Sequence, residues 1–203
     1  MTDEKRPYRK KRRAELEERT RQRITESLVE LHGTLGPART SVSALAKHAG
    51  VRRATIYRHF PDEEALFAAC SSHWRAANPY PDPASWVAVQ DVNERLRRAL
   101  EELYAHYRRD ERMIGNLLRD ETVVPILAQL LTAYRGYLSR GQEILMVGRT
   151  VGEPNRQRVR AAIGHALEFY TWRSLAIEQG LNDAEAADLM CRLVAAAGGE
   201  RGN

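Results

Sequence analysis

The stretch TSVSALAKHAGVRRATIYRHF, residues 40–60, constrains the fold of this chain more than any other. Apolar residues such as Leu45 and Ile56 recur at helical spacing on both sides of Gly50. A glycine can adopt the left-handed conformation that ends one helix and turns the chain sharply. The stretch therefore predicts two short helices joined by a tight turn, which is the pattern of a helix-turn-helix.

The second predicted helix carries, on its outward face, the residue types that a DNA major groove requires. Arginine can bond O6 and N7 of guanine, and threonine offers a hydroxyl and a methyl group, so we expect Arg53 and Thr55 to read bases. Tyrosine and histidine are better phosphate donors, a role we expect for Tyr57 and His59. Ser41 can in addition cap the first short helix. The expected DNA contacts from this region are Ser41, Arg52, Arg53, Ala54, Thr55, Tyr57 and His59.

The net charge of +5 is distributed unevenly along the chain. Residues 1–60 contain 15 Lys and Arg against 7 Asp and Glu, so the remainder carries a net charge of −3. Residues 1–13, MTDEKRPYRKKRR, lack apolar periodicity, and we expect a disordered basic arm there. Such an arm can lie along phosphates or in the minor groove; a solvated tail without a partner is the alternative. The expected arm contacts are Lys10, Lys11, Arg12 and Arg13.

The rest of the sequence shows helical periodicity and no alternating strand pattern. The segment NPYPDP, residues 78–83, has three prolines in six positions and marks a domain boundary. We expect an all-α protein of three parts: the disordered basic arm 1–13, a DNA-binding domain with its connecting helix at 14–77, and a helical C-terminal domain at 78–203. Helices beyond the boundary are expected near 84–109, 111–119, 123–147, 155–179 and 183–197.

The segment TSVSALAKHAGVRRATIYRHFPDEEALF resembles the DNA-binding segment of TetR-type (TetR/AcrR) bacterial transcriptional repressors. The resemblance implies a three-helix helix-turn-helix domain at the N-terminus and a ligand-binding and dimerisation domain at the C-terminus. It also implies a homodimer that binds a double-stranded DNA operator and is released by a small-molecule effector. Two positions depart from the family pattern: Arg52 stands where a capping serine is common, and Glu63 stands where a phosphate-binding lysine is common.

Two groups of C-terminal residues are expected to serve the effector and the dimer. Three tyrosines, each apolar with a polar tip, suit an apolar pocket with a few orienting groups. The expected pocket residues are Trp86, Leu100, Tyr104, Tyr107, Leu127, Tyr134 and Trp172. The last two long helices are apolar over more of their circumference than one buried face needs. The expected interface residues are Ala162, Ile163, Ala166, Phe169, Tyr170, Leu189, Met190 and Leu193.

Other functional classes find less support in the sequence. We expect no enzyme, because no nucleophile–base pair, HExxH motif or phosphate-binding glycine loop is present. No cofactor or metal is expected either, since Cys70 and Cys191 lack the spacing of a metal site. The polar N-terminus and the lack of a long apolar run predict a cytoplasmic protein without a membrane partner. A membrane-surface adaptor using the basic arm, and a ligand-independent repressor or an activator using the same DNA-binding domain, remain as alternatives.

Overall fold

The computed structural model describes residues 5–199, with side chains from residue 8 onward. The described range is helical and contains no strand. It divides into two compact units. The N-terminal unit comprises the described residues up to Asn78 together with Asn116–Ala128, and the C-terminal unit comprises Pro79–Gly115 and the described residues from Gln129 onward. The sequence placed 116–128 in the C-terminal domain, whereas the structure packs them with the N-terminal unit.

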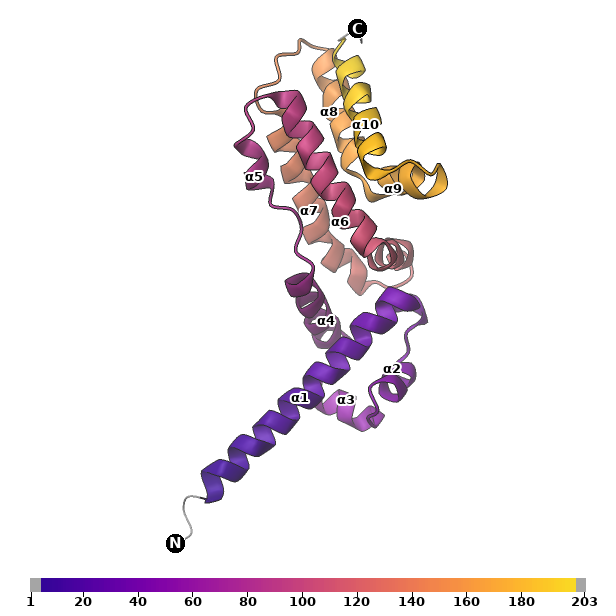
Figure 1. The fold of residues 1–203 in the computed structure, drawn as a ribbon. Helices are drawn as coiled ribbons and strands as arrows, with labels where there is room; N and C mark the ends of the chain where they lie inside the picture. The colour runs from indigo at the N-terminus through magenta and orange to yellow at the C-terminus, as the bar shows by residue number, and fades with distance from the viewer. Residues whose placement is uncertain (1–4, 200–203) are drawn as a thin grey trace. The chain divides into compact units, whose positions relative to one another are not determined.

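The N-terminal unit is built around a small helical core. Its elements are α1 (Lys5–Thr34), the 3-10 turn η1 (Pro37–Arg39), α2 (Val42–His48), α3 (Arg53–His59) and α4 (Glu63–Ala77) (Figure 1). Asp62 caps α4 by accepting a hydrogen bond from the Ala65 N–H at 2.7 Å, as expected from its position before two glutamates. The apolar faces of the four α-helices meet in one buried cluster, which contains Ile24, Leu28, Leu31, Leu45, Ala46, Ala49, Ile56, Phe60, Leu66 and Cys70.

Helix α1 begins earlier than the sequence predicted. We expected residues 1–13 to be disordered, but the structure continues α1 back to Lys5, and residues 1–4 lie outside the described range. Arginine and lysine are good helix formers, and Pro7 falls in the first turn, where its missing N–H costs nothing. Arg13 also pairs with Glu17 one turn later at 3.0 Å. The lack of an apolar face was therefore a poor argument against a helix here.

The C-terminal unit contains the remaining helices. They are α5 (Pro83–Val87), most of α6 (Val92–Asp120), α7 (Ile126–Met146) from Gln129 onward, α8 (Asn155–Leu167), α9 (Phe169–Arg173), the π-helical turn η2 (Ser174–Glu178) and α10 (Asp183–Gly198). Helices α8 and α10 run side by side (Figure 1). No helix in the described part of the chain is long and apolar enough to cross a bilayer.

The predicted break at Asp110 is wrong, and a break occurs earlier instead. Helix α6 runs through Asp110, whose buried carboxylate lies 3.2 Å from His106 one turn before it. The helical conformation is interrupted between α5 and α6, where the Asp91 carboxylate accepts hydrogen bonds from the first backbone N–H groups of α6. The buried Arg95 guanidinium donates to the Val89 carbonyl and fixes this turn.

A second unpredicted break divides the expected helix at 155–179. Glu168 adopts an extended conformation, with a ψ of 138°, and separates α8 from α9. The carbonyls of Ala166 and Leu167, which a continuous helix would use internally, accept hydrogen bonds from the hydroxyls of Tyr104 and Tyr107 on α6. These long-range hydrogen bonds compensate for the lost helical ones, and no local sequence signal indicates them.

Candidate nucleic-acid interface

The helix-turn-helix has the geometry that the sequence predicted. Gly50 has a φ of 62°, in the left-handed region, and follows Ala49, the C-cap of α2. The Val51 N–H donates to the Ala46 carbonyl at 3.0 Å, which closes the end of α2 before α3 begins. The turn thereby sets α3 against the core through Ile56, whose side chain is 1% exposed.

The outward residues of α3 are free to meet a ligand. Arg52, Arg53 and Ala54 are exposed, Tyr57 is 50% exposed and Thr55 is half-buried. Together they form one surface beside the start of the helix, the part that contacts base edges in a helix-turn-helix complex. Arg52 occupies the N-cap position without any side-chain cap bond, so its guanidinium remains available.

One basic residue of α3 was missed by the sequence analysis. Arg58 is exposed and lies one helical turn after Ala54, on the same side of α3. Its spacing of four residues from Ala54 was a sufficient signal to include Arg58 among the expected DNA contacts. Arg58 adds a further exposed positive charge to the candidate surface.

His59 is placed differently from the expectation. Its Nε2 is buried and has no hydrogen-bond partner among the described residues, so this nitrogen is not offered to DNA. The His59 carbonyl accepts a hydrogen bond from Arg21 at 2.8 Å, and the Arg21 guanidinium lies 4.4 Å from the centre of the Phe60 ring. His59 and Phe60 thus anchor the end of α3 to α1, which holds the recognition helix in place.

The other expected DNA contacts lie on α1 and at the start of α2. The Ser41 hydroxyl accepts from the Ala44 N–H at 3.1 Å, so it caps α2 as expected and keeps its own proton to donate. The exposed arm residues are carried by a helix instead of a flexible chain; they are Lys10, Lys11, Arg12 and Arg13. The spacing of their positive charges is consequently set by the helix.

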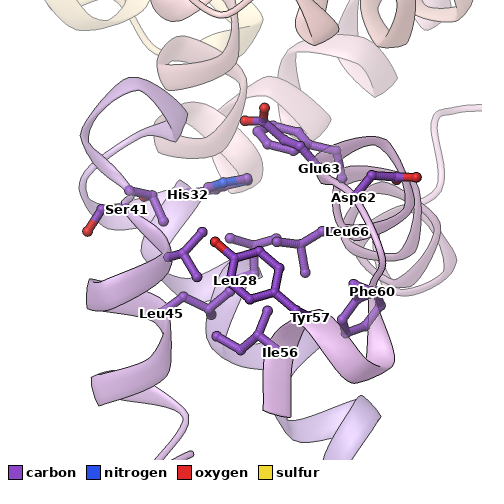
Figure 2. Close-up of a pocket in the computed structure, with 13 residues that line it drawn as sticks. Leu28, His32, Ser41, Leu45, Ile56, Tyr57, Phe60, Asp62, Glu63 and Leu66 are labelled. Carbon is purple, nitrogen blue, oxygen red and sulfur yellow. The ribbon is translucent and has the colours of Figure 1, made fainter. Parts of the chain in front are cut away.

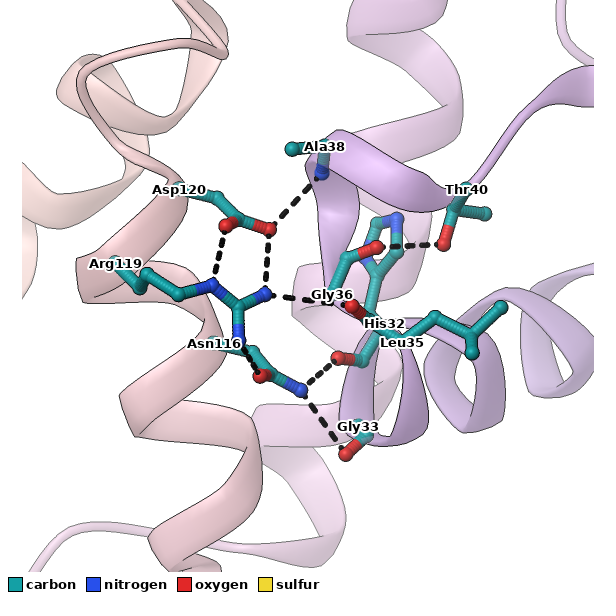
Figure 3. A network of polar contacts seen from close by, with 9 residues as sticks. All are labelled: His32, Gly33, Leu35, Gly36, Ala38, Thr40, Asn116, Arg119 and Asp120. Carbon is teal, nitrogen blue, oxygen red and sulfur yellow. Dashed lines mark hydrogen bonds and ion pairs between the residues drawn. The ribbon is translucent and has the colours of Figure 1, made fainter.

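A polar network within the N-terminal unit holds the turn between α1 and α2 (Figure 3). Asn116 donates to the carbonyls of His32 and Gly33, at 2.8 and 3.1 Å, and so caps the end of α1. Asp120 accepts from the Ala38 N–H at 3.0 Å and pairs with Arg119, which also donates to the Leu35 carbonyl. The end of α6 thereby fixes the segment that leads into the helix-turn-helix.

The Asp120 carboxylate remains charged at neutral pH. Burial acts to raise its pKa, but the hydrogen bonds from Arg119 and from the Ala38 N–H, together with the positive charge of Arg119, outweigh burial and hold the pKa below its usual value. A charged Asp120 is therefore part of the folded turn at every pH above the ordinary range of an aspartate.

The aromatic residues expected to line an effector pocket are buried, and their polar groups are engaged. Tyr104 and Tyr107 donate to backbone carbonyls at 2.8 and 2.6 Å, and burial raises the pKa of both hydroxyls, so they stay protonated. The indole N–H of Trp86 donates to Glu102 and that of Trp172 to Asp183. Tyr134 lies 3.0 Å from the Tyr107 hydroxyl, and Leu100 is fully buried. Leu127 belongs to the N-terminal unit, so the structure does not bring all seven expected residues into one unit.

The expected interface residues fall into two classes. Ile163, Ala166 and Phe169 are 0% exposed and Met190 is 6% exposed, so they serve the core of the protomer and have almost no surface to offer. Ala162 is half-buried. The residues that keep an exposed apolar surface, at 43–51%, are Tyr170, Leu189 and Leu193.

Comparisons with known proteins agree with this geometry. Residues 24–70 match the family model described as bacterial regulatory proteins of the tetR family. This match covers α2, α3 and the parts of α1 and α4 that pack against them. No curated protein matches the chain.

Several solved structures share the fold over most of the chain. A TetR-like transcriptional regulator from Rhodococcus sp. RHA1 is 18% identical, with a TM-score of 0.62 over 86% of this chain and 93% of that one. A second transcriptional regulator from Rhodococcus sp. Rha1 is 17% identical, with a TM-score of 0.60 over 90% and 99%. A TetR transcription regulator from Haloarcula marismortui is 13% identical, with a TM-score of 0.56 over 90% and 97%. At identities this low, the structural similarity shows a common fold and nothing more.

Proposed function

We propose that this chain belongs to the tetR family of bacterial regulatory proteins, whose family model matches residues 24–70, and that it is a transcriptional repressor that binds a palindromic operator as a dimer. The observation that carries the proposal is the exposed basic surface at the start of α3, formed by Arg52, Arg53 and Ala54. The proposed role is regulatory and cytoplasmic, with DNA as the macromolecular partner. An activator would use the same surface and differ only in where its operator lies.

A dimer supplies the two-fold symmetry that a palindrome requires. Two recognition helices can enter successive major grooves only when their separation matches one DNA turn, about 34–36 Å. The exposed apolar side chains of α9 and α10, Tyr170, Leu189 and Leu193, are the surface we propose for the partner protomer. Leu189 and Leu193 are one helical turn apart and so share one face of α10.

Light scattering at micromolar concentration is expected to show a dimer. The double variant Leu189→Glu, Leu193→Glu places two carboxylates in the proposed apolar interface and should shift the protein to a monomer. Val123→Glu is the matched control, because Val123 is 67% exposed yet lies in the other unit. A wild-type monomer, or a double variant that stays dimeric, would contradict this interface.

We propose that the basic stretch of α1 adds phosphate contacts. Replacing Lys10, Lys11, Arg12 and Arg13 with glutamine keeps good helix formers but removes four charges. The slope of log affinity against log salt should become shallower by about 0.9 for each phosphate contact that is lost. Arg156→Gln with Arg158→Gln, two exposed arginines of the C-terminal unit, should leave the slope unchanged. An unchanged slope in the quadruple variant would leave the stretch as a solvated helix end.

We propose further that a mostly apolar, aromatic effector binds the C-terminal unit and releases DNA. The buried Tyr137 hydroxyl has no hydrogen-bond partner among the described residues, and the Tyr80 ring stacks on the Tyr137 ring at 4.6 Å. The stacked rings and the one unused polar group suit an aromatic ligand with a single polar substituent.

The effector acts only if it binds the released state more tightly than the DNA-bound state. The first step selects compounds that raise the melting temperature of the wild-type protein but not that of the variant Tyr137→Ala. Their effect on operator affinity is then measured, and a loss of affinity is expected. If every such compound leaves DNA binding unchanged, the protein is a ligand-independent repressor or activator.

A further inference from the structure

A cavity of about 350 Å³ lies inside the N-terminal unit, between α1, α2, α3 and α4 (Figure 2). This volume falls in the range of small-molecule sites, about 300–1,000 Å³. Its floor is apolar and is formed by six buried side chains, Leu28, Leu45, Ile56, Phe60, Leu66 and Phe67. The cavity is therefore separate from the effector site proposed in the C-terminal unit.

Tyr57 stands at the mouth of this cavity. Its ring lies over the apolar floor in Figure 2, and its side chain is 50% exposed. Tyr57 is also one of the α3 residues expected to hold a DNA phosphate. The same side chain thus borders both the cavity and the candidate DNA surface.

The rim of the cavity is acidic. Asp62 and Glu63 line it, and no lysine or arginine does. The one lining histidine, His32, is neutral at pH 7, because burial lowers its pKa to about 4. The positive end of α4 would favour an anion, but the Asp62 carboxylate already accepts from the Ala65 N–H there. The charge at the mouth consequently favours a cation.

We propose that this cavity binds a small aromatic cation, with its ring on the apolar floor and its ammonium group beside Glu63. The ring of Tyr57 adds a cation–π contact at the mouth. Since a ligand below Tyr57 restricts the positions that this side chain can take, the bound cation weakens the phosphate contact that we expect Tyr57 to make. The cation site itself does not depend on the proposed DNA-binding function.

Isothermal titration calorimetry with three probes that share one naphthyl ring and differ in charge tests the site. The probes are 2-naphthylmethylammonium, the neutral 2-naphthylmethanol and the anionic 2-naphthylacetate. The cation should bind most tightly and the anion most weakly. Glu63→Gln should weaken the cation about threefold, as expected for one partly exposed ion pair. Glu64→Gln removes the same charge from the same helical turn but outside the cavity lining, and it should change nothing.

A cavity-filling variant locates the ligand. Val42→Phe adds bulk within the lining and should abolish binding of the cation, whereas Ser43→Phe, on the next and exposed residue of α2, should not. Equal binding of the three probes, or equal effects of Glu63→Gln and Glu64→Gln, would overturn the proposal. The glutamate pair keeps this test decisive if Val42→Phe fails to fold.

The link to DNA is measured separately. Saturating 2-naphthylmethylammonium should weaken binding of duplex DNA in the wild type, and this effect should disappear in Tyr57→Ala. Unchanged DNA affinity in the wild type would refute the shared use of Tyr57. A protein that binds the cation but no DNA would refute the proposed function and leave the cation site standing.

Discussion

Replacing Gly36 with alanine is expected to destabilise the N-terminal unit by about 3 kcal/mol, because two separate costs fall on one position. Gly36 has a φ of 91°, a backbone conformation that residues with a side chain rarely adopt. A β-carbon there would also collide with the side chains of Arg119 and Asp120. Those side chains cannot simply move away, since they hold the Leu35 carbonyl and the Ala38 N–H.

Gly50 provides the matched control for this substitution. It also has a positive φ, 62°, but beyond Gly50 and its two chain neighbours no atom lies within 4 Å of the position that a β-carbon would take. Gly50→Ala should therefore cost only the backbone strain, about 1–2 kcal/mol. Amide hydrogen exchange of peptides from α2 and α3, in the free protein, measures both variants in the unit concerned. Equal losses of protection would show that the side chains of the network in Figure 3 can move away from the new β-carbon without loss of stability.

Arg53→Ala is expected to weaken binding to the operator by about 1–3 kcal/mol and to flatten base preference at one position of each half-site. We propose this role because Arg53 is exposed at the start of α3 and an arginine guanidinium can bond O6 and N7 of a guanine. Titrations with the preferred site and with four single-base variants of it separate loss of affinity from loss of preference.

A phosphate contact should behave differently. Arg58→Ala, on the same helix, should weaken all five duplexes by a similar factor and leave their order unchanged. The base-reading role of Arg53 is wrong if Arg53→Ala retains the wild-type order and spacing of affinities.

Local signals were sufficient to predict much of this structure. The caps formed by Ser41, Asp62 and Asn182 are present, the last as a full capping box with Glu185. Each cap depends on residues within one helical turn, so the sequence contains all the information needed. The missing cap at Arg52 was predictable for the same reason.

Features that depend on distant residues were not predictable. The break at Glu168 is compensated by Tyr104 and Tyr107, about sixty residues earlier in the chain. Burial of Ile163 and Phe169 within the protomer likewise follows from packing, and helical periodicity alone could not separate core from interface. The prediction of a disordered arm at residues 1–13 failed for another reason. A helix without an apolar face can still form from residues of high helix propensity.

Selection of bound duplexes from a random DNA pool tests whether this chain binds DNA as a sequence-specific dimer. We expect enrichment of an inverted repeat whose half-sites are centred about 10 base pairs apart, or a multiple of that distance. The same selection with Arg53→Ala should yield a repeat with one relaxed position. Enriched duplexes that share no sequence, or that carry a single unrepeated half-site, would show that the chain does not bind DNA in this way.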